Sequence, residues 1–155
     1  MNERRTWNAA YGCTILPIRQ MDVFTPEKRS AVMRAVRGAD TGPEILVRRL
    51  VHSMGYRYGL HCGDLPGRPD LVFRRLRKVV FVHGCFWHKH NCPAGRVPES
   101  RRQYWESKLE ANVRRDRRNR KALREAGWQV MTVWECELRE QERLSQRLRR
   151  FLAAK

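Results

Sequence analysis

The chain has 155 residues and a mass of 18.5 kDa, which is the size of one ordinary domain. Its 41% hydrophobic content argues against a disordered chain, because disorder goes with low hydrophobicity. No stretch approaches the roughly 18 apolar residues that a membrane-spanning helix needs, and the first 20 residues lack the apolar core of a signal peptide. We therefore expect a soluble, cytoplasmic protein.

The charge balance is unusual, because 33 Lys and Arg stand against 16 Asp and Glu, giving a net charge of +17. A globular domain this basic favours a polyanionic partner, and nucleic acid is the first candidate. The alternative is an arginine-rich background composition, since most of the basic residues are arginine. The positive charge is spread over both halves of the chain and is not confined to a tail.

Helix-start signals come early in the chain. Residues 1–20 lack helical or strand periodicity, and we interpret them as a flexible N-terminal extension or a misassigned start before a domain over residues 21–155. A Thr-Pro-Glu start predicts a helix over residues 26–37. Thr41, with Glu44 three residues later, forms a capping box that predicts a second helix, which Gly55 ends.

Short apolar runs separated by turn residues follow. Residues 56–60 predict a short strand, and residues 64–69 have the aspartate, proline and glycine of a turn. The apolar runs 70–73 and 78–82 lie on either side of a short arginine-rich turn. This pattern predicts an antiparallel hairpin.

The last third of the chain alternates helix and strand signals. A long helix is predicted from a cap at Ser100 to about residue 126, followed by a buried strand over 128–134 and a final helix over 140–153. Helices before and after a small sheet of mixed strand direction make an α/β fold in three layers.

Residues 83–92 hold three of the five histidines and two of the five cysteines. Cys85, His90 and Cys92 can supply three ligands of a tetrahedral zinc site, and Cys136 is the best candidate for the fourth. The alternative is a group of uncoordinated buried thiols beside surface histidines. We favour structural zinc, since an odd number of cysteines without a secretory signal does not suggest a disulfide framework.

Asp70 follows Pro69 at the head of the predicted hairpin and is a candidate catalytic residue. Mg²⁺-dependent nucleases hold their metal with a carboxylate at a strand end and a second group on the neighbouring strand. The common pattern has an acid and a lysine there, but residues 81–83 are Phe, Val and His, so His83 takes the lysine position and the acid is missing. On this pattern alone, a turn aspartate explains Asp70 equally well, and Glu44 is open to either a capping or a metal-pocket interpretation.

Bulky aromatic residues accompany this segment. Phe86 and Trp87 are adjacent in an irregular loop, which suits stacking between bases. Trp105 can join them, although a tryptophan on a helix is more often a core residue. The arginine-rich run over residues 114–121 is best explained as a solvated face that contacts phosphates.

Several linked motifs stand in one order along nearly the whole chain beyond residue 20. They are Pro66-Gly67-Arg68-Pro69-Asp70, His83-Gly84-Cys85-Phe86-Trp87-His88 and Trp134-Glu135-Cys136, with Met33-Arg34-Ala35-Val36, Asn112 and Asp116. This set closely resembles the very-short-patch-repair (Vsr) DNA mismatch endonucleases. The resemblance implies a restriction-endonuclease-like core of the PD-(D/E)xK type, with a small mixed β-sheet flanked by helices and a structural zinc site.

The resemblance also implies an activity, which is nicking of one DNA strand on the 5′ side of the thymine in a T·G mismatch, the lesion left by deamination of 5-methylcytosine. In such an enzyme Asp70 and the backbone carbonyl of Val82 would hold catalytic Mg²⁺. His88 would be the general base, with His83 beside it. Glu44 would supply an acidic side chain near the metal.

Zinc and DNA contacts are implied in the same way. The zinc ligands would be Cys85, His90, Cys92 and Cys136, and the residues that intercalate into DNA would be Phe86, Trp87 and Trp105. The expected partner is double-stranded DNA with a T·G mismatch, bound by a monomer in the nucleoid-associated cytoplasm, with mismatch-repair proteins as candidate partners and no membrane. Two alternatives stay open: a restriction-type or general nuclease of the same fold, and an inactive zinc-stabilised DNA-binding module.

Overall fold

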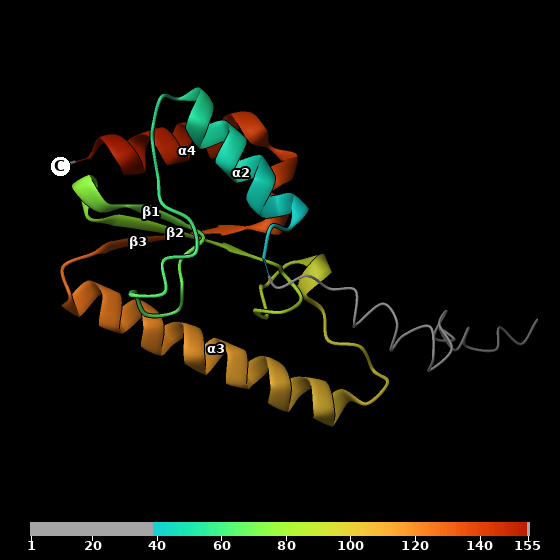
Figure 1. The fold of residues 1–155 in the computed structure, drawn as a ribbon. Helices are drawn as coiled ribbons and strands as arrows, with labels where there is room; N and C mark the ends of the chain where they lie inside the picture. The colour runs from blue at the N-terminus through green and yellow to red at the C-terminus, as the bar shows by residue number, and fades with distance from the viewer. Residues whose placement is uncertain (1–38, 155) are drawn as a thin grey trace, which may run out of the picture. The chain divides into compact units, whose positions relative to one another are not determined.

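The computed structural model describes residues 39–154, so the predicted extension over 1–20 and the predicted helix over 26–37 lie outside the described residues. The elements are α2 (Gly42–Ser53), β1 (Leu71–Phe73), η1 (Arg74–Leu76), β2 (Lys78–His83), η2 (Pro93–Gly95), α3 (Arg102–Glu125), β3 (Gln129–Trp134), η3 (Glu135–Arg139) and α4 (Gln141–Ala153), where η marks a 3-10 helix. Helices α2 and α4 cover one face of the sheet and α3 covers the other (Figure 1). The predicted three-layer α/β arrangement is confirmed.

The sheet has three strands in the order β1-β2-β3. β1 pairs with β2 in antiparallel fashion, with Leu71 opposite Val80, which confirms the predicted hairpin. β2 pairs with β3 in parallel, with Val82 opposite Val133. Because parallel neighbours need a long crossover connection, α3 lies between β2 and β3 in the chain.

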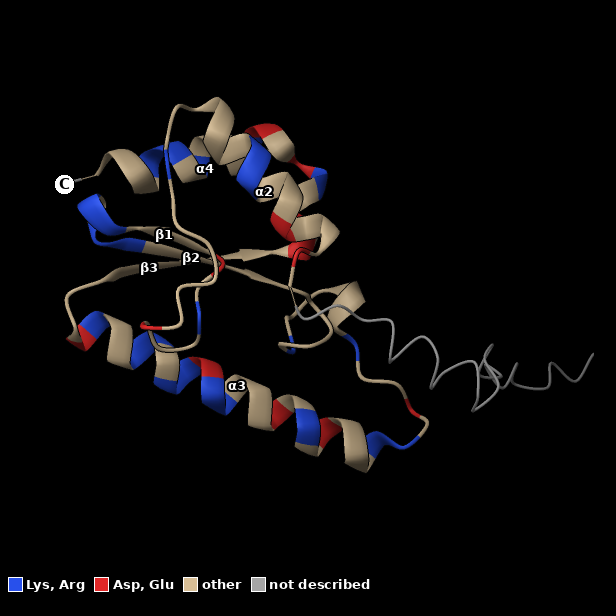
Figure 2. Ribbon diagram, viewed as in Figure 1, with Lys and Arg blue, Asp and Glu red and all other residues tan. Residues whose placement is uncertain are grey.

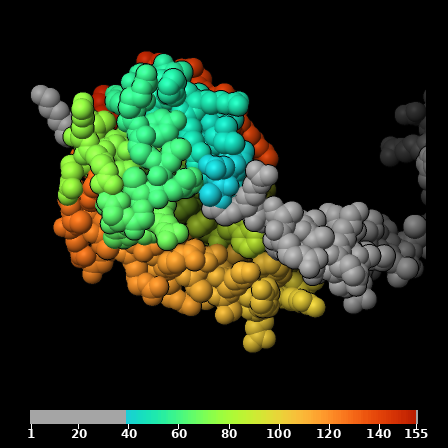
Figure 3. Space-filling view, viewed as in Figure 1, coloured from blue at the N-terminus to red at the C-terminus, as the bar shows by residue number. Residues whose placement is uncertain are grey.

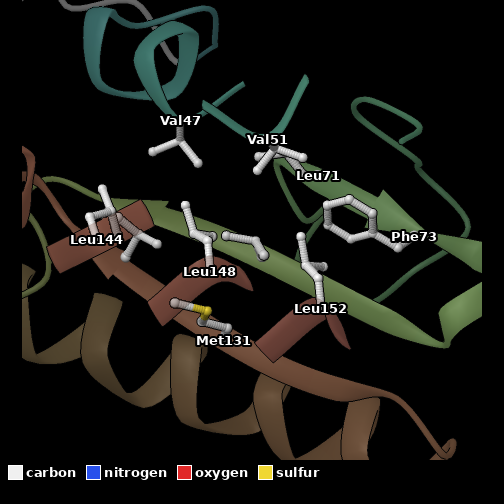
Figure 4. Packing of buried hydrophobic residues seen from close by; sticks show 10 residues of the cluster. Val47, Val51, Leu71, Phe73, Met131, Leu144, Leu148 and Leu152 are labelled. Atoms are coloured by element: carbon white, nitrogen blue, oxygen red, sulfur yellow. The ribbon is translucent and has the colours of Figure 1, made fainter. Parts of the chain in front are cut away.

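Both faces of the sheet are buried, so the strands read as nearly continuous apolar runs. Alternate residues of the three strands point to opposite sides. Toward α2 and α4 they form one cluster with helix residues, namely Val47, Val51, Leu71, Phe73, Val80, Met131, Val133, Leu144, Leu148 and Leu152 (Figure 4). Toward α3 they form a smaller cluster of Val72, Val79, Phe81, Leu123 and Trp128.

Lys78, the first residue of β2, is buried at 1% exposure between the sheet and the end of α4. Its ammonium donates to the carbonyl oxygens of Phe151 at 2.7 Å and Leu152 at 3.3 Å, and also to that of Ala154. The last carbonyls of a helix have no partners within the helix. Lys78 therefore satisfies them and attaches α4 to the sheet.

Two sequence-based predictions about elements are wrong. Residues 56–60 form no strand, and only Gly59 pairs with the sheet, exchanging hydrogen bonds of 2.8 and 2.9 Å with Val72. β1 has three residues, and only Val72 among them directs its backbone N–H and C=O away from β2. The free edge of β1 can therefore pair with only one residue of another strand. Helix α3 begins after Arg101, whose φ is 53°, and not from a cap at Ser100.

The segment between α2 and β1 lies on the visible surface between α2 and α3 (Figure 3). Its turn approaches α3 closely, since a Cβ at Gly67 would lie 2.7 Å from the amide nitrogen of Asn119. Gly67 also has a φ of 78°, which favours glycine. Among the described residues, the helices are too short or too polar to span a bilayer.

Candidate active site and metal centre

The residues singled out in the sequence gather at one end of the sheet. Asp70 immediately precedes β1, and His83 ends β2. Because β1 runs antiparallel to β2, these two residues lie at the same end. β3 is parallel to β2 and places Trp134 opposite His83, so the segment after β3 also starts there.

Four sulfur and nitrogen donors converge beside this end of the sheet. The ligand atoms of Cys85, His90, Cys92 and Cys136 all lie within 4.8 Å of one another. The Cys136 N–H donates to the Cys85 sulfur at 3.4 Å, and the Cys136 sulfur lies 3.5 Å from His90 Nδ1. The sequence-distant Cys136 therefore joins the loop to the end of β3, and the group can hold a metal ion.

The loop around this group is built to close tightly. Gly95 is buried, and a Cβ there would lie 1.9 Å from the carbonyl oxygen of His90, so no other residue fits. The His90 ring stacks on Trp134 at a centroid distance of 4.2 Å and an interplanar angle of 16°. This packing fixes the imidazole on the side of the thiols.

Two of the thiols differ in proton affinity. Burial raises the pKa of Cys85 to about 12. Burial also acts to raise the pKa of Cys92, but hydrogen bonds from His90 and Cys85 lower it to about 7. A cation with affinity for thiolate would remove both protons. The set of three thiols and one imidazole therefore fits a soft or borderline metal ion.

The Asp70 carboxylate is half-buried and contacts the neighbouring strand. Its Oδ2 accepts the Val82 N–H at 2.7 Å. Burial raises the pKa of Asp70 to about 6; the Val82 N–H opposes this shift and the charge of Glu44 adds to it. A carboxyl that is costly to ionise without a cation is typical of a metal or acid–base site.

Glu44 is 5% exposed and lies in the first turn of α2. Its Oε1 accepts the Thr41 hydroxyl at 2.8 Å, and its Oε2 accepts the Asp40 N–H at 2.9 Å. The Thr41 hydroxyl in turn accepts the Glu44 N–H at 3.4 Å. The predicted cap by Thr41 is therefore present, but the Glu44 carboxylate returns to the Asp40 N–H and the Thr41 hydroxyl instead of the Thr41 N–H. The same carboxylate is close enough to Asp70 to influence its pKa.

A histidine–aspartate pair lies next to Asp70's end of the sheet. His88 Nδ1 is 2.5 Å from Asp116 Oδ2, which comes from α3. Burial by itself would raise the pKa of Asp116, but the hydrogen bond with His88 and nearby positive charges lower it. An ionised Asp116 can only accept, so we assign the proton to His88 Nδ1, which leaves the lone pair of Nε2 available.

His83 lies against this pair. Its ring stacks on that of His88 at 3.7 Å with an interplanar angle of 8°. Burial lowers the pKa of His83 to about 3. His83 is therefore neutral at physiological pH and holds the His88 ring in its plane. The ligand atoms of His83, His88 and Asp116 also lie within 4.8 Å of one another.

Sequence reasoning gave Asp116 no role of its own. The signal was present, because Asp116 is the one acidic residue inside the arginine-rich run 114–121 and continues the apolar spacing of α3. The buried stripe of α3 is Trp105, Leu109, Asp116 and Leu123. A carboxylate on a buried stripe needs a polar partner, and here that partner is His88.

The aromatic residues form one cluster at the start of α3. Phe86 contacts Trp87 and Trp105 edge-on, each at 5.2 Å, and Trp87 lies 6.2 Å from Trp105. Asn112 donates to the Trp87 carbonyl at 3.0 Å and holds the loop on α3. Trp105 is 8% exposed, whereas Phe86 and Trp87 are half-buried.

The face of α3 opposite its buried stripe is basic. Lys and Arg recur along the helix (Figure 2). The exposed members in the second half of the helix are Arg114, Arg115, Arg117, Arg118, Lys121 and Arg124. This placement agrees with the predicted solvated basic face.

Comparison with known proteins agrees with this arrangement. The chain is 52% identical over 131 residues to the type II nicking enzyme V.XorIIP of Xanthomonas oryzae, covering 84% of this chain and 96% of that protein. It is 44% identical over 124 residues to the DNA mismatch endonuclease Vsr of Escherichia coli K12, covering 80% of each chain.

The fold has a relative among solved structures. The catalytic domain of homing endonuclease I-Bth0305I superposes with a TM-score of 0.51 at 19% identity, covering 72% of this chain and 94% of that domain. This likeness confirms the predicted restriction-endonuclease-like fold.

Residues 21–94 match the family described as DNA mismatch endonuclease Vsr. Together with the relatives above, this match confirms the predicted enzyme class, a DNA endonuclease acting on phosphodiester bonds. The chain belongs to the Vsr family of DNA mismatch endonucleases.

Proposed function

We propose that this chain is a Mg²⁺-dependent endonuclease that nicks one strand of duplex DNA on the 5′ side of the thymine in a T·G mismatch, and so starts repair of deaminated 5-methylcytosine. The names of the relatives support the reaction, since they are mismatch or nicking endonucleases. The observation that carries the proposal is that two acidic side chains, Asp70 and Glu44, and the His88–Asp116 pair lie toward one end of the sheet.

Asp70 and the Val82 carbonyl suit Mg²⁺, which prefers oxygen ligands. In an extended strand the N–H and C=O of one residue point to the same side, and the Val82 N–H points at Asp70. Continuing the β1–β2 register places Pro69 opposite Val82, and proline has no N–H to donate to that carbonyl. The Asp70 carboxylate and the Val82 carbonyl oxygen are therefore both available to bind one cation.

When bound, Mg²⁺ would supply Lewis-acid stabilisation of the negative charge that develops on the scissile phosphate and the leaving 3′ oxygen. The protein's own residues handle the proton. His88 Nε2 takes a proton from the attacking water, while Asp116 holds the ring in the required tautomer and stabilises the imidazolium. Neutral His83 keeps the His88 ring in position by stacking.

We propose zinc as the ion held by the three thiols and His90. The donor set is that of a closed structural site, which contributes folding free energy directly. Its role is to fix the loop that carries Trp87 and His88, because Cys85 and His90 flank these residues on either side. The zinc site thus sets the distance between the general base His88 and the aromatic cluster.

We propose that Phe86, Trp87 and Trp105 insert between base pairs beside the mismatch. Phe86 and Trp87 are reachable from solvent, and Trp105 packs beneath them. Insertion unstacks a base step, which costs less at a mismatch than at a paired step. That difference contributes to the selection of T·G.

The test uses duplexes that carry one T·G pair or the matched C·G pair in the same sequence, with each strand labelled in turn and Mg²⁺ present. We expect one product, cut on the 5′ side of the thymine, with the opposite strand intact and the matched duplex uncut. Equal cutting of both duplexes would favour a general nuclease of the same fold. Binding without any cutting would favour an inactive DNA-binding module.

A further inference from the structure

Arg48 lies one helical turn after Glu44 on α2, and its side chain is only 13% exposed. Its Nη1 is 2.5 Å from Asp40 Oδ1, and its Nη2 is 3.0 Å from Glu44 Oε2. The same Nη2 is 3.3 Å from His61 Nε2. One guanidinium therefore bridges the exposed carboxylate of Asp40 and the buried carboxylate of Glu44.

The donors around Arg48 would otherwise resemble a metal site. The ligand atoms of Asp40, Glu44 and His61 lie within 4.8 Å of one another. The guanidinium contacts all three groups, so it acts as the cation of this cluster. Glu44 is nearly fully buried, and a buried carboxylate is costly unless a cation pairs with it.

We propose that Arg48 is a positioning residue of the catalytic metal site, which fixes the Glu44 carboxylate beside Asp70 and screens its negative charge. This inference rests on the proposed Mg²⁺ site at Asp70. Arg48 does not touch the reacting atoms, and it acts through Glu44 and through its charge.

The contacts of Glu44 support the positioning part. Its Oε2 accepts from both the Asp40 N–H and Arg48, and its Oε1 accepts from the Thr41 hydroxyl. Three donors from three residues leave the carboxylate one orientation. Arg48 is the only charged donor among them, and charge-assisted hydrogen bonds are the stronger kind.

The charges support the screening part. Arg48 Nη2 lies 3.0 Å from Glu44 Oε2, so the two opposite charges form one ion pair, and both act on the Asp70 carboxyl. Both charges therefore reach Asp70, with opposite sign. A divalent cation at Asp70 would interact with the same two charges, and its double charge would double the energy of each interaction.

The test compares Mn²⁺ binding with nicking for Arg48→Met, which removes the charge and keeps the side chain's bulk. We expect the DNA-free, zinc-loaded variant to bind Mn²⁺ about threefold to tenfold more tightly, because a positive charge near the cation is gone. We expect its nicking rate at saturating metal to fall about tenfold or more, because Glu44 is no longer fixed. A role in folding alone would lower the active fraction without tightening Mn²⁺ binding.

Two further variants separate charge from geometry. Arg48→Lys keeps the positive charge but loses the paired N–H donors of the planar guanidinium. We therefore expect Mn²⁺ affinity within about twofold of wild type and a reduced nicking rate. Arg49→Met removes the same charge from the exposed neighbouring position on the helix, and we expect both quantities unchanged.

Mn²⁺ affinity that is unchanged or weaker in Arg48→Met would overturn the proposal, as would equal changes in Arg49→Met. If Arg48→Met fails to fold, wild-type nicking by Arg48→Lys would overturn the positioning role. The proposed function fails by a different result, namely undiminished Mn²⁺ binding and nicking by Asp70→Asn.

Discussion

The Asp70 carboxyl is subject to opposing influences. Burial raises its pKa to about 6, above the ordinary aspartate value of 3.8, although the Val82 N–H stabilises the ionised form. A metal ligand has to be deprotonated, so a proton competes with the cation. Because the pKa is raised, this competition reaches to a higher pH than it does at an ordinary aspartate.

The consequence is a defined pH dependence of metal binding. We expect the Mn²⁺ affinity of the DNA-free protein to be constant above about pH 6 and to fall about tenfold per pH unit below it. Calorimetric titrations between pH 5 and 8 measure this directly, with Asp70→Asn as the variant that binds weakly throughout. An affinity that stays flat down to pH 5 would contradict the raised pKa.

Helix α3 supplies residues both to the hydrophobic core and to the candidate catalytic site. Its buried stripe carries Leu123, which packs against the sheet, and Asp116, which contacts His88. In Asp116→Asn the amide donates to Nδ1 and favours the wrong tautomer. We expect the single-turnover nicking rate to fall by about 10²- to 10⁴-fold with DNA affinity nearly unchanged. A rate within a few-fold of wild type would show that His88 needs no acidic partner.

The segment after β3 is attached to the loop after β2 through the metal group. We expect purified protein to hold about one zinc ion per chain, and Cys136→Ser to lose it and to unfold about 10 °C or more below wild type. Cys62→Ser, outside the group, is the matched control and should keep its zinc. Elemental analysis and thermal unfolding check both. Active wild-type protein without zinc would refute the site.

How far the sequence predicts each element depends on where the determining contact lies. The start of α2 was predictable because Thr41 and Glu44 lie three residues apart and cap the helix locally. The hairpin was predictable from two apolar runs on either side of a short arginine-rich turn. Residues 56–60 were mispredicted because the length of β1, and not their own composition, limits their pairing to Gly59.

The candidate site divides in the same way. The four metal donors and Asp70 stand in recognisable motifs, so their grouping followed from spacing and from the family resemblance. The His88–Asp116 contact joins residues 28 positions apart, and no local pattern specifies it. Lys78 is similar: nothing in its neighbourhood indicates that its ammonium binds the end of α4, 73 residues later.

For the whole molecule, the charge of +17 determines affinity more than specificity. A protein that contacts several phosphates releases counterions, so we expect DNA affinity to fall by about 10³-fold or more between 50 and 200 mM salt. The factor should be similar for T·G and matched duplexes. Replacing exposed Arg117 and Arg118 by glutamine should reduce the slope of log affinity against log salt by about two. Fluorescence anisotropy measures these slopes, and a salt-independent affinity would contradict phosphate contacts.

The central claim is that Asp70 holds the cation that makes this fold a nicking enzyme. The most direct test is the single-turnover nicking rate of Asp70→Asn on a T·G duplex at saturating Mg²⁺, with binding followed in parallel. We expect the rate to fall at least about 10³-fold while affinity for the duplex stays within a few-fold of wild type. Nicking by Asp70→Asn at a rate comparable to wild type would contradict the account.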